Sequence, residues 1–173
     1  SYCTAIKGDA NVNISGGNIT ITLPTANKGG KGIKCAGNMT ISGGYVYAHG
    51  QHNDGIDSNG NCYIKGGTVY AVCSGSPEVA IDANTEGGCK LYLTGGTVVA
   101  VGGLENGSQL SQSCYQSPSW SPNTIYALTS GNGTLSFKTP SSGGSGLVVS
   151  SASQPSLQSG VNVSGGTTYF GGL

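Results

Sequence analysis

Residues 53–71 read NDGIDSNGNCYIKGGTVYA, and similar sequences recur along the first part of the chain. The Gly–Gly pair in this stretch has three counterparts, so that such pairs begin at positions 16, 43, 66 and 95, with steps of 27, 23 and 29 residues. Repetition at this period is typical of solenoids, in which each unit buries its apolar face only against its neighbours. The sequence therefore predicts about four stacked units.

Apolar and polar residues alternate on both sides of each Gly–Gly pair, as in Cys62, Ile64, Val69 and Ala71. A period of two predicts strands and not helices. We expect three short strands per unit: one at an isoleucine such as Ile56, one before the glycines and one after them. Glycine lets the chain turn a corner where a Cβ would clash. The predicted fold is all-β, a right-handed single-stranded parallel β-helix.

Alignment of the units on the first glycine predicts which interior residues stack on one another. A leucine-rich repeat would need a helical segment in each unit, and a propeller blade would need four strands in about 40 residues. Neither pattern is present, which favours the β-helix. The five expected interior columns are Val12–Met39–Cys62–Leu91, Ile14–Ile41–Ile64–Leu93, Ile19–Val46–Val69–Val98, Ile21–Ala48–Ala71–Ala100 and Ile6–Ile33–Ile56–Ile81.

The composition narrows the class of protein. The 173 residues fit one domain, and charged residues make up 8% of them against about 25% in a typical domain. All seven basic residues are lysines, and the net charge is zero, so a nucleic-acid binder is not expected. Low charge and many Asn, Ser, Thr and Gly residues favour a secreted or surface protein. Because residue 1 falls inside a repeat, we expect a fragment of a longer exported precursor. We also expect the chain to be a monomer.

The six cysteines do not form a zinc motif, because no C-x-x-C spacing occurs. An even number permits disulfides, but fifteen pairings are open for six cysteines. Cys62 falls in an interior column and is expected to act as a small apolar side chain. A catalytic cysteine would need a nearby base, and His49 and His52 are the two histidines available.

The repeat stops near residue 103, and the sequence after it has a different pattern. Residues 104–123 are polar and irregular, which predicts a loop with Trp120 as its anchor. An open solenoid end would template aggregation if nothing covered it. We therefore expect residues 104–173 to cap and flank the β-helix of residues 1–103 within the same domain. The strands predicted in this segment are 125–128, 135–137, 147–149 and 161–170.

Two acidic residues are expected to lie one above the other on the outer surface. Asp57 and Asp82 follow the inward isoleucines of adjacent units, about 4.8 Å apart, and repel unless a proton or a cation lies between them. Neighbouring carboxylate and amide oxygens suit Ca²⁺, which takes 6 to 8 oxygen ligands. Alternatively, the Asp side chains cap backbone N–H groups and the Asn side chains form a ladder, with Lys34 beside Asp57 in a weak ion pair. The predicted calcium ligands are Asp54, Asp57, Asn59, Glu78, Asp82 and Asn84.

Tyrosines recur at the spacing of the units in two outward columns. Tyr47 and Tyr70 occupy one, and Tyr63 and Tyr92 occupy the other. A row of aromatic rings suits the apolar face of a sugar, so these four residues are the predicted carbohydrate-binding platform. The alternative is that they are cross-strand aromatic pairs that stabilise the sheet.

These motifs resemble a known family: the calcium-binding, carbohydrate-binding parallel β-helix modules of secreted and surface proteins of anaerobic bacteria, which are similar in structure to pectate lyases. The resemblance implies binding of an acidic plant-type polysaccharide such as polygalacturonate, calcium at corner carboxylates, and an extracellular or bacterial cell-surface location. The matching calcium positions are Asp54, Asp57 and Asp82. The residues that carry the resemblance are 31–34, 54–60, 64–71, 80–84 and 95–103, with a closing segment at 137–140, 147–151 and 159–160.

The sequence favours a binder over an enzyme. A polysaccharide lyase of this architecture needs a Lys or Arg base beside a calcium ion. The chain has no Arg, and Lys34 beside the Asp57 carboxylate would stay protonated. We expect a non-catalytic carbohydrate-binding or adhesin-like surface module that uses calcium. The alternatives are a structural spacer without a specific ligand and, second, a polysaccharide lyase.

Overall fold

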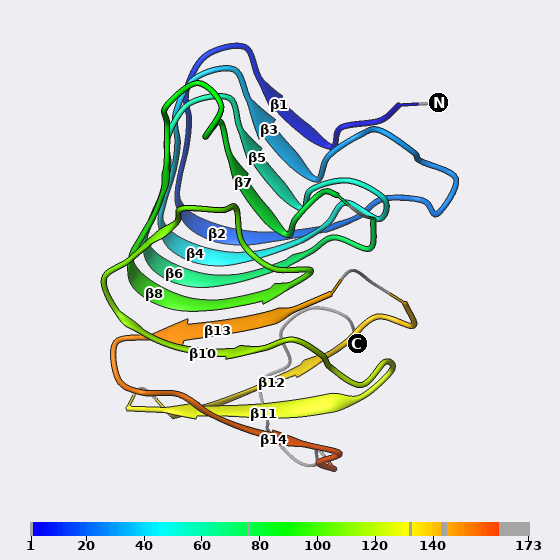
Figure 1. Ribbon diagram of the computed structural model, residues 1–173, viewed down its shortest axis with the longest axis vertical. Helices are drawn as coiled ribbons and strands as arrows, with labels where there is room; N and C mark the ends of the chain where they lie inside the picture. Colours follow the sequence, from blue (N-terminus) through cyan, green and yellow to red (C-terminus); the bar gives the residue numbers. More distant parts are fainter. Residues whose placement is uncertain (1, 76, 132, 143–144, 163–173) are drawn as a thin grey trace.

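A computed structural model describes residues 2–75, 77–131, 133–142 and 145–162 of the chain. The chain coils so that its strands stack turn upon turn, and we call each turn a rung (Figure 1). Each of the first four rungs contributes one short strand and one long strand. The short strands are β1 (Ile6–Gly8), β3 (Ile33–Cys35), β5 (Ile56–Ser58) and β7 (Ile81–Ala83). The long strands are β2 (Val12–Thr22), β4 (Met39–His49), β6 (Cys62–Val72) and β8 (Leu91–Val101).

Equivalent strands of successive rungs pair in parallel, as the repeat predicts. The short strands form a sheet in the order β1-β3-β5-β7, in which Ile33 pairs with Ile56 and Ile56 with Ile81. The long strands stack in the order β2-β4-β6-β8, and their registers confirm the other four interior columns. The parallel β-helix prediction is therefore confirmed, and the described residues form no helix.

Each long strand passes through its Gly–Gly pair without a break, which differs from the two separate strands that we expected. The second glycine of each pair has a positive φ, such as 86° at Gly44 and 79° at Gly67, so it bends the strand while the hydrogen-bonded ladder resumes beyond it. The first glycine of the pair has a different role. A Cβ at Gly66 would lie 2.4 Å from the carbonyl oxygen of Ser42 in the rung before, so the rungs can stack only if this side chain is absent.

The interior of the coil is a continuous apolar core. Ile33, Ile56 and Ile81 are fully buried in one column, and burial of such a side chain stabilises a fold by about 1.5–3 kcal/mol. Cys62 is fully buried among them, as the alternation predicted. The six cysteines all lie in the described residues, and all are free thiols.

The segment after residue 103 covers the last rung. Strand β13 (Leu147–Ser151) pairs antiparallel with β8, and β10 (Ser113–Ser117) pairs with β13. Strand β9 (Gln109–Leu110) pairs in parallel with the first half of β8. The prediction of a loop throughout residues 104–123 is therefore wrong for β9 and β10. Strand β10 is polar because it lies at the edge of the sheet, where Tyr115 is 40% exposed.

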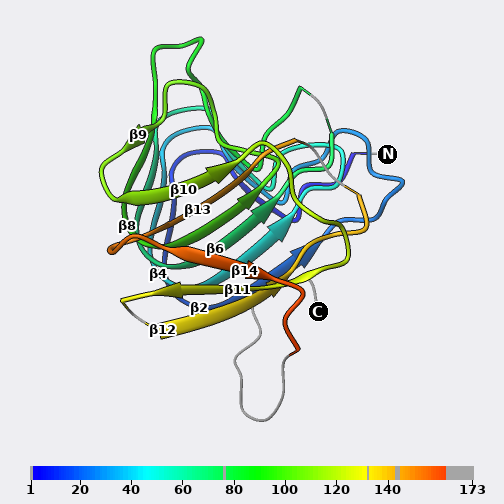
Figure 2. The same ribbon diagram turned by 60° about the horizontal axis from the view of Figure 1, so that its bottom comes forward.

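A third sheet, of three strands, lies against the outer face of the long strands (Figure 2). It consists of β11 (Ile125–Ser130), β12 (Gly133–Lys138) and β14 (Ser156–Ser159). Its apolar residues Tyr126, Leu128 and Phe137 pack with Tyr70 and Val99 of the rungs in a second core. The anchor Trp120 is partly buried against this core. Residues 163–170 of the last predicted strand lie outside the described residues.

Candidate functional site

Two lysines of one rung bind two aspartates of the next rung, on the outer face of the β3-β5-β7 sheet. Lys31 Nζ lies 2.7 Å from Asp54 Oδ2 and 2.8 Å from Asp57 Oδ2. Lys34 Nζ lies 2.7 Å from the same Asp57 oxygen. The Asp54 side chain has no exposed surface, and that of Asp57 is 4% exposed. We call these four residues, together with Asp82, the lysine–carboxylate cluster.

Rung spacing explains the cluster. Lys34 and Asp57 each follow the inward isoleucine of their rung, and they are register partners in β3 and β5. This is the ion pair that the sequence predicted. Lys31 and Asp54 each stand two residues before that isoleucine, so stacking brings them together as well. Lys31 was not among the predicted site residues, although the same alignment places it beside Asp54.

The buried charges compensate one another. Burial disfavours the charged form of Lys31, but hydrogen bonds and charges from Asp54 and Asp57 outweigh burial and raise the pKa of this lysine. Burial also raises the pKa of Asp54, while the hydrogen bond from Lys31 and the backbone N–H of Val79 oppose that shift. Among the described residues, no buried side-chain nitrogen or oxygen lacks a hydrogen-bond partner. The cluster is thus electrostatically satisfied by the chain's own groups.

Asp82, the fifth member of the cluster, lies on the next rung, where it is the register partner of Asp57. Burial, together with a hydrogen bond to Glu105, raises the pKa of Asp82 from its ordinary 3.8 to about 9. Glu105 is held in turn by the backbone N–H of Asn106 at 2.8 Å and the Thr85 hydroxyl at 3.1 Å. A hydrogen bond between two carboxyl groups needs a proton, and the raised pKa of Asp82 keeps that proton on Asp82 at neutral pH.

This proton makes stability depend on pH. Between pH 3.8 and 9 the folded protein keeps a proton at Asp82 that the unfolded chain has released, so the free energy of unfolding falls as pH rises. Buried His49, with a pKa lowered by burial to about 4, acts in the opposite direction, but only below its ordinary value of 6.5. From pH 6.5 to 9 we therefore expect the melting midpoint to fall, and we expect Asp82→Asn to flatten the profile. Equal slopes for both proteins would contradict this assignment.

The predicted calcium ligands come together only in part. Asp54, Asp57 and Asp82 have oxygen atoms within 4.8 Å of one another, and Glu78 lies close enough to Asp54 that, after burial, the Asp54 charge helps to raise the pKa of Glu78. Asn59 Oδ1, however, accepts a hydrogen bond from Lys34.

The other predicted amide ligand, Asn84, donates from Nδ2 to the backbone oxygen of Asn59 and accepts at Oδ1 from the N–H of Gly87. Together with the lysines this arrangement fits an ion-pair cluster with an amide ladder better than a calcium cage. A calcium ion would have to displace Lys31 from between Asp54 and Asp57. Calcium binding here stays a prediction.

The tyrosine columns differ from the predicted open platform. Tyr47 is 6% exposed and Tyr70 is fully buried, because the β11-β12-β14 sheet covers them. The Tyr70 hydroxyl donates to the backbone oxygen of Lys138 at 2.6 Å, and its ring lies 5.4 Å from that of Phe137. Alternation placed both rings correctly on the outside of the coil, but a later segment buries them. This pair is not a surface that a sugar can reach.

Tyr63 and Tyr92 are half-buried and stack on each other. Their ring centroids are 5.2 Å apart with an interplanar angle of 9°, and the Lys65 ammonium lies 5.2 Å from the centroid of Tyr63. One face of each ring is therefore packed against the other ring. This is the geometry of a cross-strand aromatic pair, the alternative that the sequence left open.

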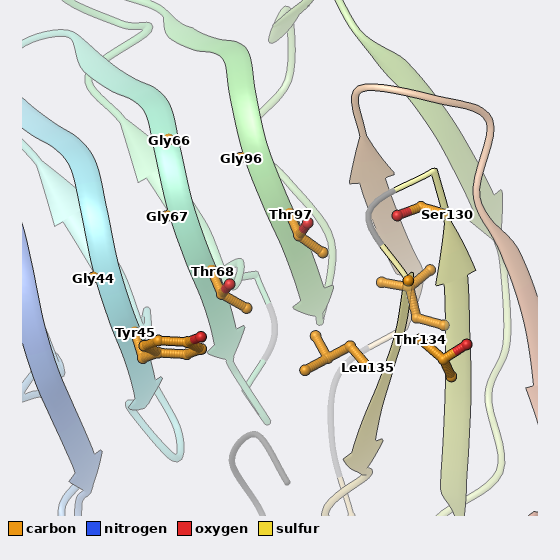
Figure 3. A pocket seen from close by; sticks show the side chains of 12 residues that line it. Gly44, Tyr45, Gly66, Gly67, Thr68, Gly96, Thr97, Ser130, Thr134 and Leu135 are labelled. Atoms are coloured by element: carbon orange, nitrogen blue, oxygen red, sulfur yellow. The ribbon is translucent and has the colours of Figure 1, made fainter. Parts of the chain in front are cut away.

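A groove lies between the Gly–Gly corners of the rungs and the β11–β12 hairpin (Figure 3). Its volume is about 640 Å³. Tyr45, which is 48% exposed, projects from β4 into it, and Thr68 and Thr97 follow in the same column on β6 and β8. We call this surface the corner groove. Its lining residues are Gly44, Tyr45, Gly66, Gly67, Thr68, Gly96, Thr97, Leu128, Ser130, Gly133, Thr134 and Leu135.

The corner groove was not predicted from the sequence. Alternation places the residue two after the first glycine of each pair outward, and that column reads Asn18, Tyr45, Thr68 and Thr97. This signal was available from the repeat. The opposite wall was not, because it comes from a hairpin that is distant in sequence and whose position no repeat specifies.

A family profile described as "Carbohydrate-binding domain-containing protein" matches residues 1–78. The matched part contains Tyr45, Thr68 and four members of the lysine–carboxylate cluster, but not the β11–β12 wall of the corner groove. Comparison with curated proteins and with solved structures finds no match. The described part of the chain has no helix of the length and apolarity that a membrane span requires.

Proposed function

We propose that the chain is a non-catalytic module that binds a polysaccharide in the corner groove. The observation that carries this proposal is the exposed Tyr45 ring beside the stacked hydroxyls of Thr68 and Thr97, in a groove of about 640 Å³. The match of residues 1–78 to a carbohydrate-binding family supports it. An adhesin-like role at the cell surface or outside the cell is compatible with such a ligand.

The chemistry of the groove suits a sugar chain. An aromatic ring offers a flat apolar face for the C–H side of a pyranose. Thr68 and Thr97 present hydroxyls that repeat at the rung spacing of about 4.8 Å, so the groove offers similar contacts to successive parts of a polymer. The glycines leave backbone atoms open to close approach.

The lining also indicates the class of polysaccharide. None of the twelve described lining residues is an acid, a lysine or a histidine. A uronate carboxylate would find no cation there, so we infer that the groove prefers a neutral polymer to polygalacturonate. The same lining offers no acid–base pair for glycoside cleavage. In the cluster, hydrogen bonds and charges from Asp54 and Asp57 outweigh burial and raise the pKa of Lys31, which makes this lysine unsuited to act as a base. Lys34 is already paired with the Asp57 carboxylate.

Affinity electrophoresis through gels that contain soluble polysaccharides tests the proposal. We expect retardation by at least one neutral polymer, with the same mobility in calcium and in chelator, because no carboxylate lines the groove. Retardation by polygalacturonate only, and only with calcium, would favour the acidic ligand and a metal at the lysine–carboxylate cluster. Migration unaffected by every polymer would favour the second candidate, a structural spacer.

Chelation also tests calcium without any sugar. We expect the melting midpoint to be the same in calcium and in chelator, because Lys31 and Lys34 already neutralise Asp54 and Asp57. A ligand present at 100 times its Kd stabilises a fold by about 2.7 kcal/mol. For a domain of this size, that is a rise of roughly 5–10 °C, which is readily measured. Such a rise would show that calcium displaces Lys31.

A further inference from the structure

The chain contains three Asn–Gly dipeptides, at 59–60, 106–107 and 132–133, and asparagine is a chemically labile residue. Glycine has no side chain to shield its backbone nitrogen, so this nitrogen can attack the preceding side-chain amide wherever the backbone is free to move. Residue 132 lies outside the described residues. The two described dipeptides have opposite surroundings, and these surroundings decide their reactivity.

The dipeptide at Asn59 is held between rungs. The Gly60 N–H donates to the backbone oxygen of Gly37 at 3.0 Å, and a Cβ on Gly60 would lie 2.5 Å from Asn38 Oδ1. The side-chain oxygen of Asn59 accepts a hydrogen bond from Lys34 Nζ at 3.1 Å. The nitrogen that would attack is therefore already bonded, and neither residue of the dipeptide can rotate without breaking these contacts.

The dipeptide at Asn106 is open. It lies between β8 and β9 in a turn that the Ser108 N–H closes by donating to the backbone oxygen of Glu105 at 3.3 Å. Gly107 has a φ of 73°, which suits the third position of a type II turn. Asn106 and Gly107 are exposed, and a Cβ on Gly107 would meet nothing within 4 Å. Within the described part of the chain, neither the Gly107 N–H nor the Asn106 side-chain amide has a hydrogen-bond partner.

We propose that Asn106 is a site of spontaneous deamidation, at which the folded chain converts asparagine to aspartate and isoaspartate while Asn59 is protected. The Gly107 backbone nitrogen, after hydroxide has taken its proton, attacks Cγ of Asn106. The new C–N bond forms, the bond from Cγ to Nδ2 breaks, and ammonia leaves with a proton from water, which restores the hydroxide. The product is a five-membered succinimide that joins the two residues.

Water then opens the succinimide at one of its two carbonyl carbons. Addition at Cγ gives aspartate. Addition at the backbone carbonyl carbon gives isoaspartate, in which the main chain continues through the side chain and gains one methylene group. The two reactions together exchange ammonia for water, so no oxidant or other reactant is needed.

Both products place a new negative charge on a chain whose net charge is zero. This charge lies next to Glu105, whose side chain accepts a hydrogen bond from the Asn106 backbone N–H at 2.8 Å. The isoaspartyl form also lengthens the backbone within the turn, so we expect it to loosen β9, where Gln109 pairs with Tyr92. The inference does not depend on the carbohydrate proposal, because the corner groove draws none of its described lining from this turn.

Incubation of the folded 173-residue chain in mildly alkaline buffer tests the proposal, with fragmentation mass spectrometry to assign each amide-to-acid change to a residue. We expect Asn106 to react at least about tenfold faster than Asn59, because the rungs must open locally before Asn59 can react. The same incubation in concentrated urea is the control, since both dipeptides are then free and should react at similar rates. Asn106→Gln, whose longer side chain would have to close a larger ring, should leave position 106 unchanged.

Two results would overturn the proposal. The first is similar rates at Asn59 and Asn106 in the folded chain, since the contacts between rungs would then make no difference. The second is an Asn106 that reacts about tenfold or more slowly in the folded chain than in urea, since the turn would then protect it.

Discussion

Lys31→Met is expected to lower the free energy of unfolding by about 3–5 kcal/mol, the usual cost of removing one partner from a buried ion pair. Methionine retains most of the length and apolar surface of the side chain, so the change tests mainly the charge. It leaves the Asp54 carboxylate, which has no exposed surface, without its ammonium partner. Urea denaturation followed by circular dichroism measures the loss.

Lys34→Met is the matched control for this prediction. The Lys34 side chain is 27% exposed, and Asp57 would keep its contact with Lys31, so we expect a loss of about 1 kcal/mol or less. Adding Asp54→Asn to Lys31→Met should recover part of the stability, because the uncompensated charge is gone. Similar losses from Lys31→Met and Lys34→Met would show that the buried charge is not what makes Lys31 important.

Phe137→Ala is expected to cost about 3–5 kcal/mol and to loosen the β11-β12-β14 sheet from the rungs. The ring is fully buried, with Tyr70 at 5.4 Å and Tyr126 at 5.5 Å between centroids. Its loss removes the main contact that covers the Tyr47–Tyr70 column. Denaturant unfolding gives the cost, and hydrogen exchange shows whether protection is lost in β11 and β12 first.

Leu157→Ala provides the comparison for Phe137→Ala. Leu157 lies on β14 at the margin of the same core and is only partly buried, so its truncation should cost clearly less. A loss below about 1 kcal/mol for Phe137→Ala would mean that the three-stranded sheet contributes little to the stability of the domain.

The rungs could be predicted from the sequence because the β-helix is built from local repetition. Each inward residue has an equivalent about one unit away, and parallel stacking converts that spacing into contact. Ile33, Ile56 and Ile81 form one buried column for this reason. The ion pair of Lys34 with Asp57 follows from the same alignment.

What the sequence did not predict lies where the repeat meets other parts of the chain. Alternation places Tyr70 on the outside of the coil, but only the position of Phe137 and its sheet makes it buried. The corner groove needs the same hairpin for its second wall. These contacts join segments about 70 residues apart and have no period, so no pattern in the sequence indicates them.

The calcium prediction shows a different limit. The alignment brought Asp57 and Asp82 onto adjacent rungs, and the structure pairs them in register. Two stacked carboxylates need a cation or a proton, and the sequence left open a calcium ion or aspartates that cap backbone N–H groups. In the structure Lys31 binds Asp57, and the raised pKa of Asp82 keeps a proton on that carboxyl group at neutral pH. Both solutions obey the same electrostatic rule, and the identity of the compensating group depends on side-chain placement.

The most direct test of the corner groove is a comparison of three tyrosine variants on a polysaccharide that retards the wild-type chain. Tyr45→Ala should weaken binding by about tenfold, or about 1.4 kcal/mol, because it removes the one aromatic ring among the described lining residues. Tyr63→Ala changes the stacked pair and Tyr115→Ala an exposed ring outside the groove, and both should bind like the wild type. Unchanged binding by Tyr45→Ala together with a loss in Tyr63→Ala would contradict the assignment of the corner groove as the carbohydrate site.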